Sequence, residues 1–476
     1  MERRLSMIMV HRLQSLSLAA WAGIVAATGF LLRLVLWLAY EPVSYSDSFS
    51  YRRLAEAILD GWGRYDGTRT PGYPLFLAAV GPDQQVWLVQ MGLGLGTTML
   101  FFAMAWLISR RAWFAGLVGL AHTLNLGQLF FEANLITETL ATFLVTAALA
   151  GTFLWLTRPE RQTFWLAVLI STSASLAWLT RPLFIYLPFW LLLFVALAPS
   201  RAQATPEITR ASWRAGLAGL SISWGKAAAY LVPALVILGL WASYIQGRYH
   251  VWSLSVMSGY HLMQHAGNFF ELLPDEEAAL RDTYLKYRGA QIEETGTQTN
   301  TIWDAIPEMQ QVSGLNFYSL SRKLGDLSLQ LITDHPDLYL QNAAKGWWFF
   351  WRAPVYWSPE AFESRAIRSG LDITILVQRG LLFGCNLLFV VTSLAAVFWG
   401  RARRIWRLGS PLWCLAGTIW IASVLQTLLD HGDNPRFLVP LQSLVAFWGL
   451  WLVYQTALWW IQRGETDALA PLPDAS

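Results

Sequence analysis

The chain has 476 residues, of which 55% are hydrophobic and only 14% are charged, and its formal net charge is +3. A soluble protein of this length exposes far more charge, so the composition excludes a soluble enzyme. A net charge this small does not indicate binding to nucleic acid, and we expect no nucleic acid partner. The only cysteines, Cys385 and Cys414, both lie in apolar segments, so no disulfide framework is available.

Long apolar runs recur along the whole chain. A run of about 20 apolar residues is needed to cross roughly 30 Å of hydrocarbon as a helix. The runs therefore predict an all-α integral membrane protein with about ten transmembrane helices. The expected spans are 18–40, 86–108, 112–130, 134–156, 163–180, 182–199, 227–245, 373–399, 411–429 and 437–459.

Basic residues indicate how the spans are oriented. With the N-terminus inside, most of them fall in cytoplasmic segments, and the short outer loops hold few. This bias predicts that both termini are cytoplasmic; the expected location, integral to the plasma membrane with a bacterial inner membrane favoured, goes with the family resemblance described below. The first span follows Arg3 and Arg4, but its apolar run is too long for a signal peptide. We interpret it as an uncleaved anchor.

Two outer segments divide the chain into modules. Residues 41–85 form a first outer loop, and residues 246–372 are long enough for a small extracytoplasmic helical domain between spans 7 and 8. Helices are expected near 271–290, 313–333 and 336–352, the last with Pro336 in its first turn. The predicted modules are 1–245 (membrane, with the first loop), 246–372 (extracytoplasmic), 373–460 (membrane) and 461–476 (cytoplasmic tail).

The first outer loop is the most informative segment. Apolar residues within 49–59 recur at helical spacing, which predicts a short amphipathic helix lying along the membrane interface. Ser46 or Asp47 is expected to cap its N-terminus, because short polar side chains are favoured there. The loop then continues as Arg69-Thr-Pro-Gly-Tyr-Pro-Leu.

The predicted topology gathers acidic and basic side chains at the outer face. Polar groups at membrane depth are costly and tend to be functional. Arginines beside carboxylates suit a phosphate that must be held while a neighbouring hydroxyl loses its proton. The residues concerned are Asp47, Arg69, Glu132, Glu138, Arg181, Asp430, His431, Asp433 and Arg436.

Several motifs occur in a characteristic order. They are Asp47 with Tyr51 and Ala55, Arg69-Thr-Pro-Gly-Tyr73-Pro-Leu-Phe-Leu, Leu135-Ile-Thr-Glu138-Thr-Leu, Thr180-Arg181-Pro182, His335-Pro-Asp-Leu-Tyr339 and Arg436-Phe-Leu-Val-Pro440. The ordered set resembles the multi-span glycosyltransferases that use sugars on a polyprenyl phosphate. That family includes bacterial relatives of dolichyl-phosphate-mannose-protein mannosyltransferase and the aminoarabinose transferase acting on lipid A. Its acidic motif often has two adjacent acids, whereas Ser48 follows Asp47 here.

The resemblance implies a membrane enzyme that transfers a sugar from a polyprenyl-phosphate donor to an acceptor hydroxyl at the outer face. The partners it implies are that donor, a protein, lipid or glycan acceptor, and membrane lipid. Asp47 would be the catalytic base, and Glu138 would position Arg69 or, with Asp47, help bind a divalent cation. The implied substrate-binding residues are Tyr51, Arg69, Tyr73, Arg181, His431 and Arg436.

Plainer interpretations stand beside these. Asp47 could serve only as a helix N-cap, and Glu138 could serve only to complement the dipole of its helix. Arg33 and Arg181 could extend their side chains to the membrane interface by snorkelling. A lipid-linked-sugar flippase or transporter is the alternative function. A flippase or transporter is expected to have internal repeats and ionisable residues near the bilayer midplane. The centres of the expected spans contain almost no charged residues.

Overall fold

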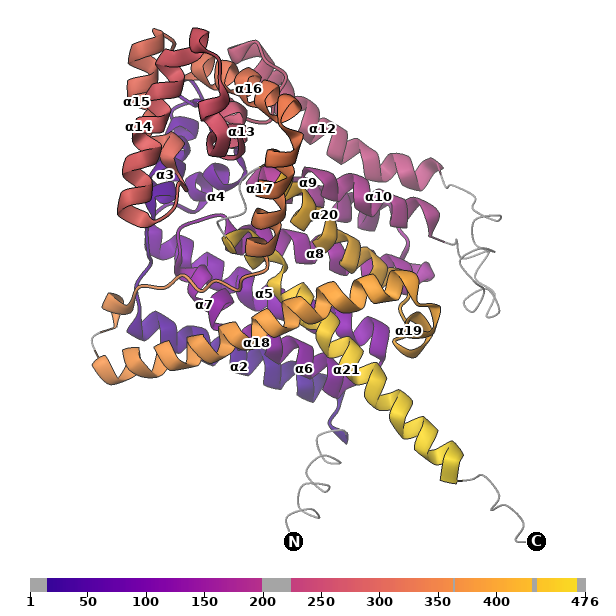
Figure 1. Cartoon of the computed structure of the whole chain (residues 1–476). Helices are drawn as coiled ribbons and strands as arrows, with labels where there is room; N and C mark the ends of the chain where they lie inside the picture. The colour runs from indigo at the N-terminus through magenta and orange to yellow at the C-terminus, as the bar shows by residue number, and fades with distance from the viewer. Residues whose placement is uncertain (1–14, 199–223, 363, 430–434, 469–476) are drawn as a thin grey trace, which may run out of the picture.

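The computed structural model describes residues 15–198, 224–362, 364–429 and 435–468 (Figure 1). Within these ranges the chain is helical and has no strand, apart from one isolated β-bridge between Val43 and Asn134. The all-α class is therefore confirmed.

Seven helices in the described ranges are long and apolar enough to cross a membrane. This confirms a multi-pass membrane protein. The seven are α2 (Leu18–Ala39), α5 (Asp83–Ser109), α8 (Glu138–Thr157), α12 (Trp224–Tyr249), α18 (Arg365–Phe398), α20 (Ser410–Leu429) and α21 (Val439–Ala468). The last of these extends beyond residue 460, where the sequence predicts a separate tail.

One expected span is broken. Residues 112–130 form α6 (Ala112–Thr123) and α7 (Leu126–Ala133), which meet at a bend of 51° and count as an eighth span if taken together. The break falls at Asn125, whose side chain accepts a hydrogen bond from the backbone N–H of Gly127 and so caps α7. Two shorter apolar helices, α9 (Phe164–Thr180) and α10 (Leu187–Leu197), cover two further expected spans.

Four further helices lie together at the upper left of Figure 1, away from α19 (Gly400–Ile405) at the right, and a fifth runs from them down to α20. They have a hydrophobic core of their own, which includes Tyr260, Phe270, Met309 and Leu324. The helices are α13 (Ser258–Ala266), α14 (Ala278–Thr295), α15 (Thr301–Ser313), α16 (Phe317–Asp334) and α17 (Pro336–Phe350). The sequence predicts α14, α16 and α17, but not α13, which has only nine residues, or α15, which contains an internal proline.

The membrane helices differ in how deeply they are buried. The apolar window of α21 is 78% buried and that of α8 is 67% buried, whereas α2 and α18 are mostly exposed. Helices that are apolar all round belong in the interior of a bundle. The N-terminal ends of these two buried helices meet, because Glu138 Oε1 lies 3.6 Å from Arg436 Nε.

That loop contains two helices, α3 (Ser46–Leu59) and α4 (Gly72–Val80). The predicted cap of α3 is wrong by one or two residues. Tyr45 is the N-cap, and its backbone N–H donates to the Ser48 hydroxyl at 2.9 Å. The carboxylate of Asp47 therefore need not cap the helix and faces other partners.

The start of α4 packs directly against the end of α9. A Cβ atom on Gly72 would lie 2.6 Å from the backbone of Leu179 and Thr180, so only glycine permits this approach. The contact places Arg69, before α4, close to Arg181, which follows α9.

Gly72→Ala is expected to lower the apparent melting temperature of the purified protein, with a cost of about 1–3 kcal/mol for overpacking. Gly92→Ala is the matched control, because a Cβ atom on Gly92 meets nothing within 4 Å. The measurement is thermal unfolding in one detergent. Equal melting temperatures for the two variants would contradict the close contact between α4 and α9.

Candidate active site

Asp47 lies in the first turn of α3 and contacts two arginines. Its Oδ1 accepts a hydrogen bond from Arg69 Nη2, and its Oδ2 accepts one from Arg436 Nη2, both at 2.6 Å. Arg436 follows Asp47 by 389 positions and lies in the short 3-10 turn Pro435–Leu438, just before α21. The Asp47–Arg436 ion pair thus joins the first outer loop to the start of α21.

A second carboxylate lies beside the first. Glu138, in the first turn of α8, accepts a hydrogen bond from Arg181 Nη1 at 2.5 Å, and its Oε1 also lies 3.6 Å from Arg436 Nε. Arg436 therefore bridges the two acids. The resemblance implies that Glu138 positions Arg69, whereas in the structure its ion-pair partners are Arg181 and Arg436.

Arg69 is held by its own loop. The hydroxyl of Tyr65 donates to the backbone carbonyl of Arg69 at 2.9 Å, and the guanidinium lies 5.4 Å from the centre of the Tyr51 ring. Tyr51 in turn makes an edge-to-face contact with Tyr73, at a centroid distance of 5.1 Å. Of the two aromatic residues named by the resemblance, Tyr51 thus contacts Arg69 and Tyr73 contacts Tyr51. Tyr73 is fully buried and donates to Gln90 Oε1 at 3.1 Å, which links the loop to α5.

The turn between α7 and α8 is tied to the same loop. Val43 donates to the carbonyl of Ala133, and Leu135 donates to the carbonyl of Val43, both at 2.9 Å. The side-chain amide of Asn134 donates to the carbonyl of Tyr356 at 3.0 Å. The structure thus adds Tyr356 to the residues around the site. The only signal for it in the sequence is its position at the end of an aromatic run.

Most of the site is buried, but some of its side chains are partly exposed to solvent. The side chains of Asp47, Arg69 and Arg436 are between 19% and 26% exposed, whereas Glu138 is 1% exposed. Burial by itself raises the pKa of the Asp47 carboxyl, but the nearby arginines outweigh it and lower the pKa to about 2. Asp47 is therefore ionised at any physiological pH and can accept a hydrogen bond or a proton.

Six of the eight predicted site residues come together here: Asp47, Tyr51, Arg69, Glu138, Arg181 and Arg436. Tyr73 supports them from behind. His431 lies outside the described residues, as do Asp430 and Asp433.

The described residues do not fit a metal centre. They contain no group of three or more His, Cys, Asp or Glu side chains that could hold an ion. The two proposed ligands, Asp47 and Glu138, both face guanidinium groups, and a positive charge there opposes the binding of a cation.

A second buried ion pair lies in the membrane part. Arg33 does not snorkel: its Nη2 donates to Glu132 Oε1 at 2.5 Å, and both side chains are at most 5% exposed. Its Nη1 donates to the hydroxyl of Thr123 and to the carbonyl of Gly29, both at 2.9 Å. Gly94 faces this pair, and any side chain there would overlap the Glu132 carboxylate. The pair joins α2 to α7, and therefore to the turn before Glu138.

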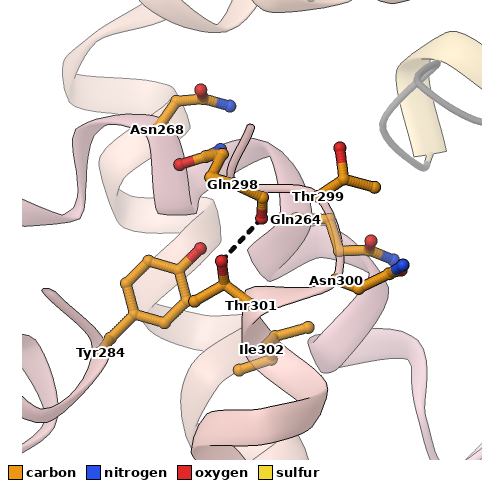
Figure 2. Close-up of a pocket in the computed structure, with 8 residues that line it drawn as sticks. All are labelled: Gln264, Asn268, Tyr284, Gln298, Thr299, Asn300, Thr301 and Ile302. Carbon is orange, nitrogen blue, oxygen red and sulfur yellow. Dashed lines mark hydrogen bonds between the residues drawn. The ribbon is translucent and has the colours of Figure 1, made fainter. Parts of the chain in front are cut away.

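One polar pocket among helices α13, α14 and α15 is too small for a substrate. Figure 2 shows its walls, formed by α13, α14 and the turn that enters α15, where the Thr301 hydroxyl donates to the carbonyl of Gln298. Its volume is about 20 Å³, which is enough for roughly one water molecule. The arginine and carboxylate cluster therefore remains the best candidate for chemistry.

Comparison with models of known protein families, with curated proteins and with solved structures finds no match to this chain.

Glu132→Leu should destabilise the protein by about 3–5 kcal/mol, because it leaves the buried charge of Arg33 without a partner. The double variant Arg33→Met/Glu132→Leu should recover most of that loss, since two apolar side chains need no partner. Thermal unfolding of both variants in detergent measures the difference. A double variant no more stable than Glu132→Leu would refute the coupling of the two charges.

Proposed function

We propose that this protein is a membrane glycosyltransferase that moves a sugar from a polyprenyl-phosphate donor to an acceptor hydroxyl at the outer face of the membrane. One observation carries the proposal. Two carboxylates and three arginines, from five separate segments of the chain, meet in a cluster beside the first outer loop. Those five segments belong to the ordered motifs on which the resemblance rests.

The charge of the cluster supports a phosphate substrate. Three guanidinium groups against two carboxylates leave one positive charge, which matches the single negative charge of a sugar phosphodiester. Cleavage of the sugar–phosphate bond leaves polyprenyl phosphate with a second negative charge. Arginines already in place stabilise that charge as it develops in the transition state. Arg69 and Arg436 are the candidates, because both are partly exposed.

Asp47 is the proposed base. The acceptor oxygen attacks the anomeric carbon, the bond to phosphate breaks on the opposite side, and the hydroxyl proton passes to Asp47, so the configuration inverts. A carboxylate with a pKa of about 2 is a weak base, and it serves because the hydroxyl becomes acidic as its new bond forms. Each carboxylate oxygen keeps a lone pair beyond the one used by its arginine.

Glu138 is the proposed positioning residue. It is almost fully buried and holds Arg181 and Arg436 from the N-terminus of α8, where the helix dipole favours a negative charge. Its burial keeps the acceptor away from it, which leaves Asp47 as the only one of the two acids that a substrate can reach.

The proposal includes ten spans, with both termini on the cytoplasmic side of a bacterial inner membrane. In this arrangement the bent pair α6–α7 and the shorter helices α9 and α10 each cross the bilayer. The charged cluster and the domain formed by α13–α17 then lie on the outer side, whereas the basic helix α19 lies inside.

Asp47→Asn tests the chemistry. The cap of α3 is made by Tyr45 and Ser48, so the asparagine variant should fold and bind donor, while transfer falls by about 10²–10⁴-fold. The assay follows release of polyprenyl phosphate from a radiolabelled donor by purified protein in detergent. A flippase would release no polyprenyl phosphate under these conditions. Asp83→Asn, an exposed acid at the start of α5, is the control. Transfer by Asp47→Asn at a third of the wild-type rate or above would remove Asp47 from the mechanism.

Single cysteines test the orientation in a background that lacks Cys385 and Cys414. An impermeant thiol reagent should label positions 47 and 300 in intact cells, and should label positions 111 and 404 only after the membrane is opened. Labelling of position 404 but not 300 in intact cells would reverse the topology and refute an outer-face reaction.

A further inference from the structure

A cleft of about 600 Å³ opens where the first outer loop meets the C-terminus of α12 and the start of α16. Ligand sites of small molecules fall in this range of volume and often lie where two parts of a protein meet. The side chains that matter here are those of Arg64, Asp66, Arg248, Tyr249, His250 and Tyr318. None of them belongs to the charged cluster.

The cleft carries an excess of positive charge. Asp66 is already neutralised, because its Oδ2 accepts a hydrogen bond from Arg53 Nη2 at 2.5 Å. Arg248 donates to the carbonyl of Gly63 at 2.5 Å and to the hydroxyl of Tyr249 at 3.2 Å, both neutral groups. No carboxylate in the described parts of the chain pairs with Arg248. Its guanidinium is therefore available to an anion from outside.

An aromatic surface lies beside that charge. The rings of Tyr249 and Tyr318 are 4.8 Å apart between centroids, and Tyr318 is 37% exposed. Tyrosine combines an apolar ring with a polar hydroxyl, so it suits a ligand that has both C–H faces and hydroxyl groups. A sugar ring has this chemistry.

The cleft is connected to the proposed active site through two hydrogen bonds. The hydroxyl of Tyr249 donates to the carbonyl of Tyr65, and the hydroxyl of Tyr65 donates to the carbonyl of Arg69, each at 2.9 Å. His250, in the wall of the cleft, has a φ of 56°, a conformation that is strained for a residue with a side chain. Such strain gathers at ligand sites, where the surrounding structure maintains it.

We propose that this cleft binds the acceptor, and that the acceptor is a saccharide carrying an anionic group, either phosphate or carboxylate. Arg248 binds the anion, and Tyr318 packs against the sugar ring. The inference rests on the proposed glycosyl transfer and names the class of acceptor that the transfer uses.

The test measures binding and needs no turnover. The full-length protein in a non-ionic detergent is titrated with glucose 6-phosphate, glucuronate, glucose, inorganic phosphate and a short-chain phosphatidylglycerol, and saturation-transfer NMR follows each probe. Glucose 6-phosphate and glucuronate should bind more tightly than glucose or inorganic phosphate. Arg248→Ala should weaken the binding of both anionic sugars by about tenfold or more, the scale of one hydrogen bond to a charged group. Tyr318→Ala should weaken all three sugars but not inorganic phosphate.

Arg322→Ala is the matched control, because Arg322 is an exposed arginine on the same helix, α16, outside the cleft. It should leave every affinity unchanged. Equal affinity for glucose 6-phosphate in wild type and Arg248→Ala would overturn the proposal. Tighter binding of phosphatidylglycerol than of either anionic sugar would make the cleft a lipid-headgroup site and overturn it as well. A failure of glycosyl transfer itself would instead appear in the Asp47→Asn assay, which does not depend on these probes.

Discussion

The ion pairs of Arg436 couple the start of α21 to α3 and α8. One guanidinium contacts Asp47 on α3 and lies next to Glu138 on α8, so a single side chain near the start of α21 joins three distant segments. Removing one partner from a buried ion pair costs far more than the pair contributes, because it leaves a charge without compensation. The relative positions of α3, α8 and α21 are therefore coupled through charge.

A second buried ion pair couples other segments in the same way. Arg33 and Glu132 pair inside the membrane part and join α2 to α7, just before the turn that leads to Glu138. The backbone bridge between Val43 and Asn134 ties that turn to the first outer loop. The ion pairs of Arg33 and of Arg436 thus lie on either side of one turn, and that turn leads to Glu138, the second acid of the candidate site. A rigid turn suits a residue that must hold two arginines in place.

The proposed chemistry follows from the differences in burial within the cluster. Glu138 and Arg181 are almost fully enclosed, whereas Asp47, Arg69 and Arg436 are partly exposed. The enclosed pair gives the site its shape, and the exposed groups are those that a phosphate and a hydroxyl can reach. In the proposed arrangement the donor's lipid chain stays in the bilayer, and the acceptor occupies the cleft beside Arg248, between the first outer loop, α12 and α16.

The sequence by itself determined the class of this protein, because hydrocarbon requires long apolar helices and their length can be counted. It also indicated the acids and arginines of the candidate site, since charged residues near a membrane are few. It did not determine the partners within that site: Glu138 holds Arg181 and Arg436 rather than Arg69, and Arg33 is buried rather than snorkelling. Local pattern also misplaced the cap of α3 and missed the break at Asn125. Only the tertiary structure decided these points, because an ion pair between residues 389 positions apart depends on how helices pack and leaves no periodic signal in the chain.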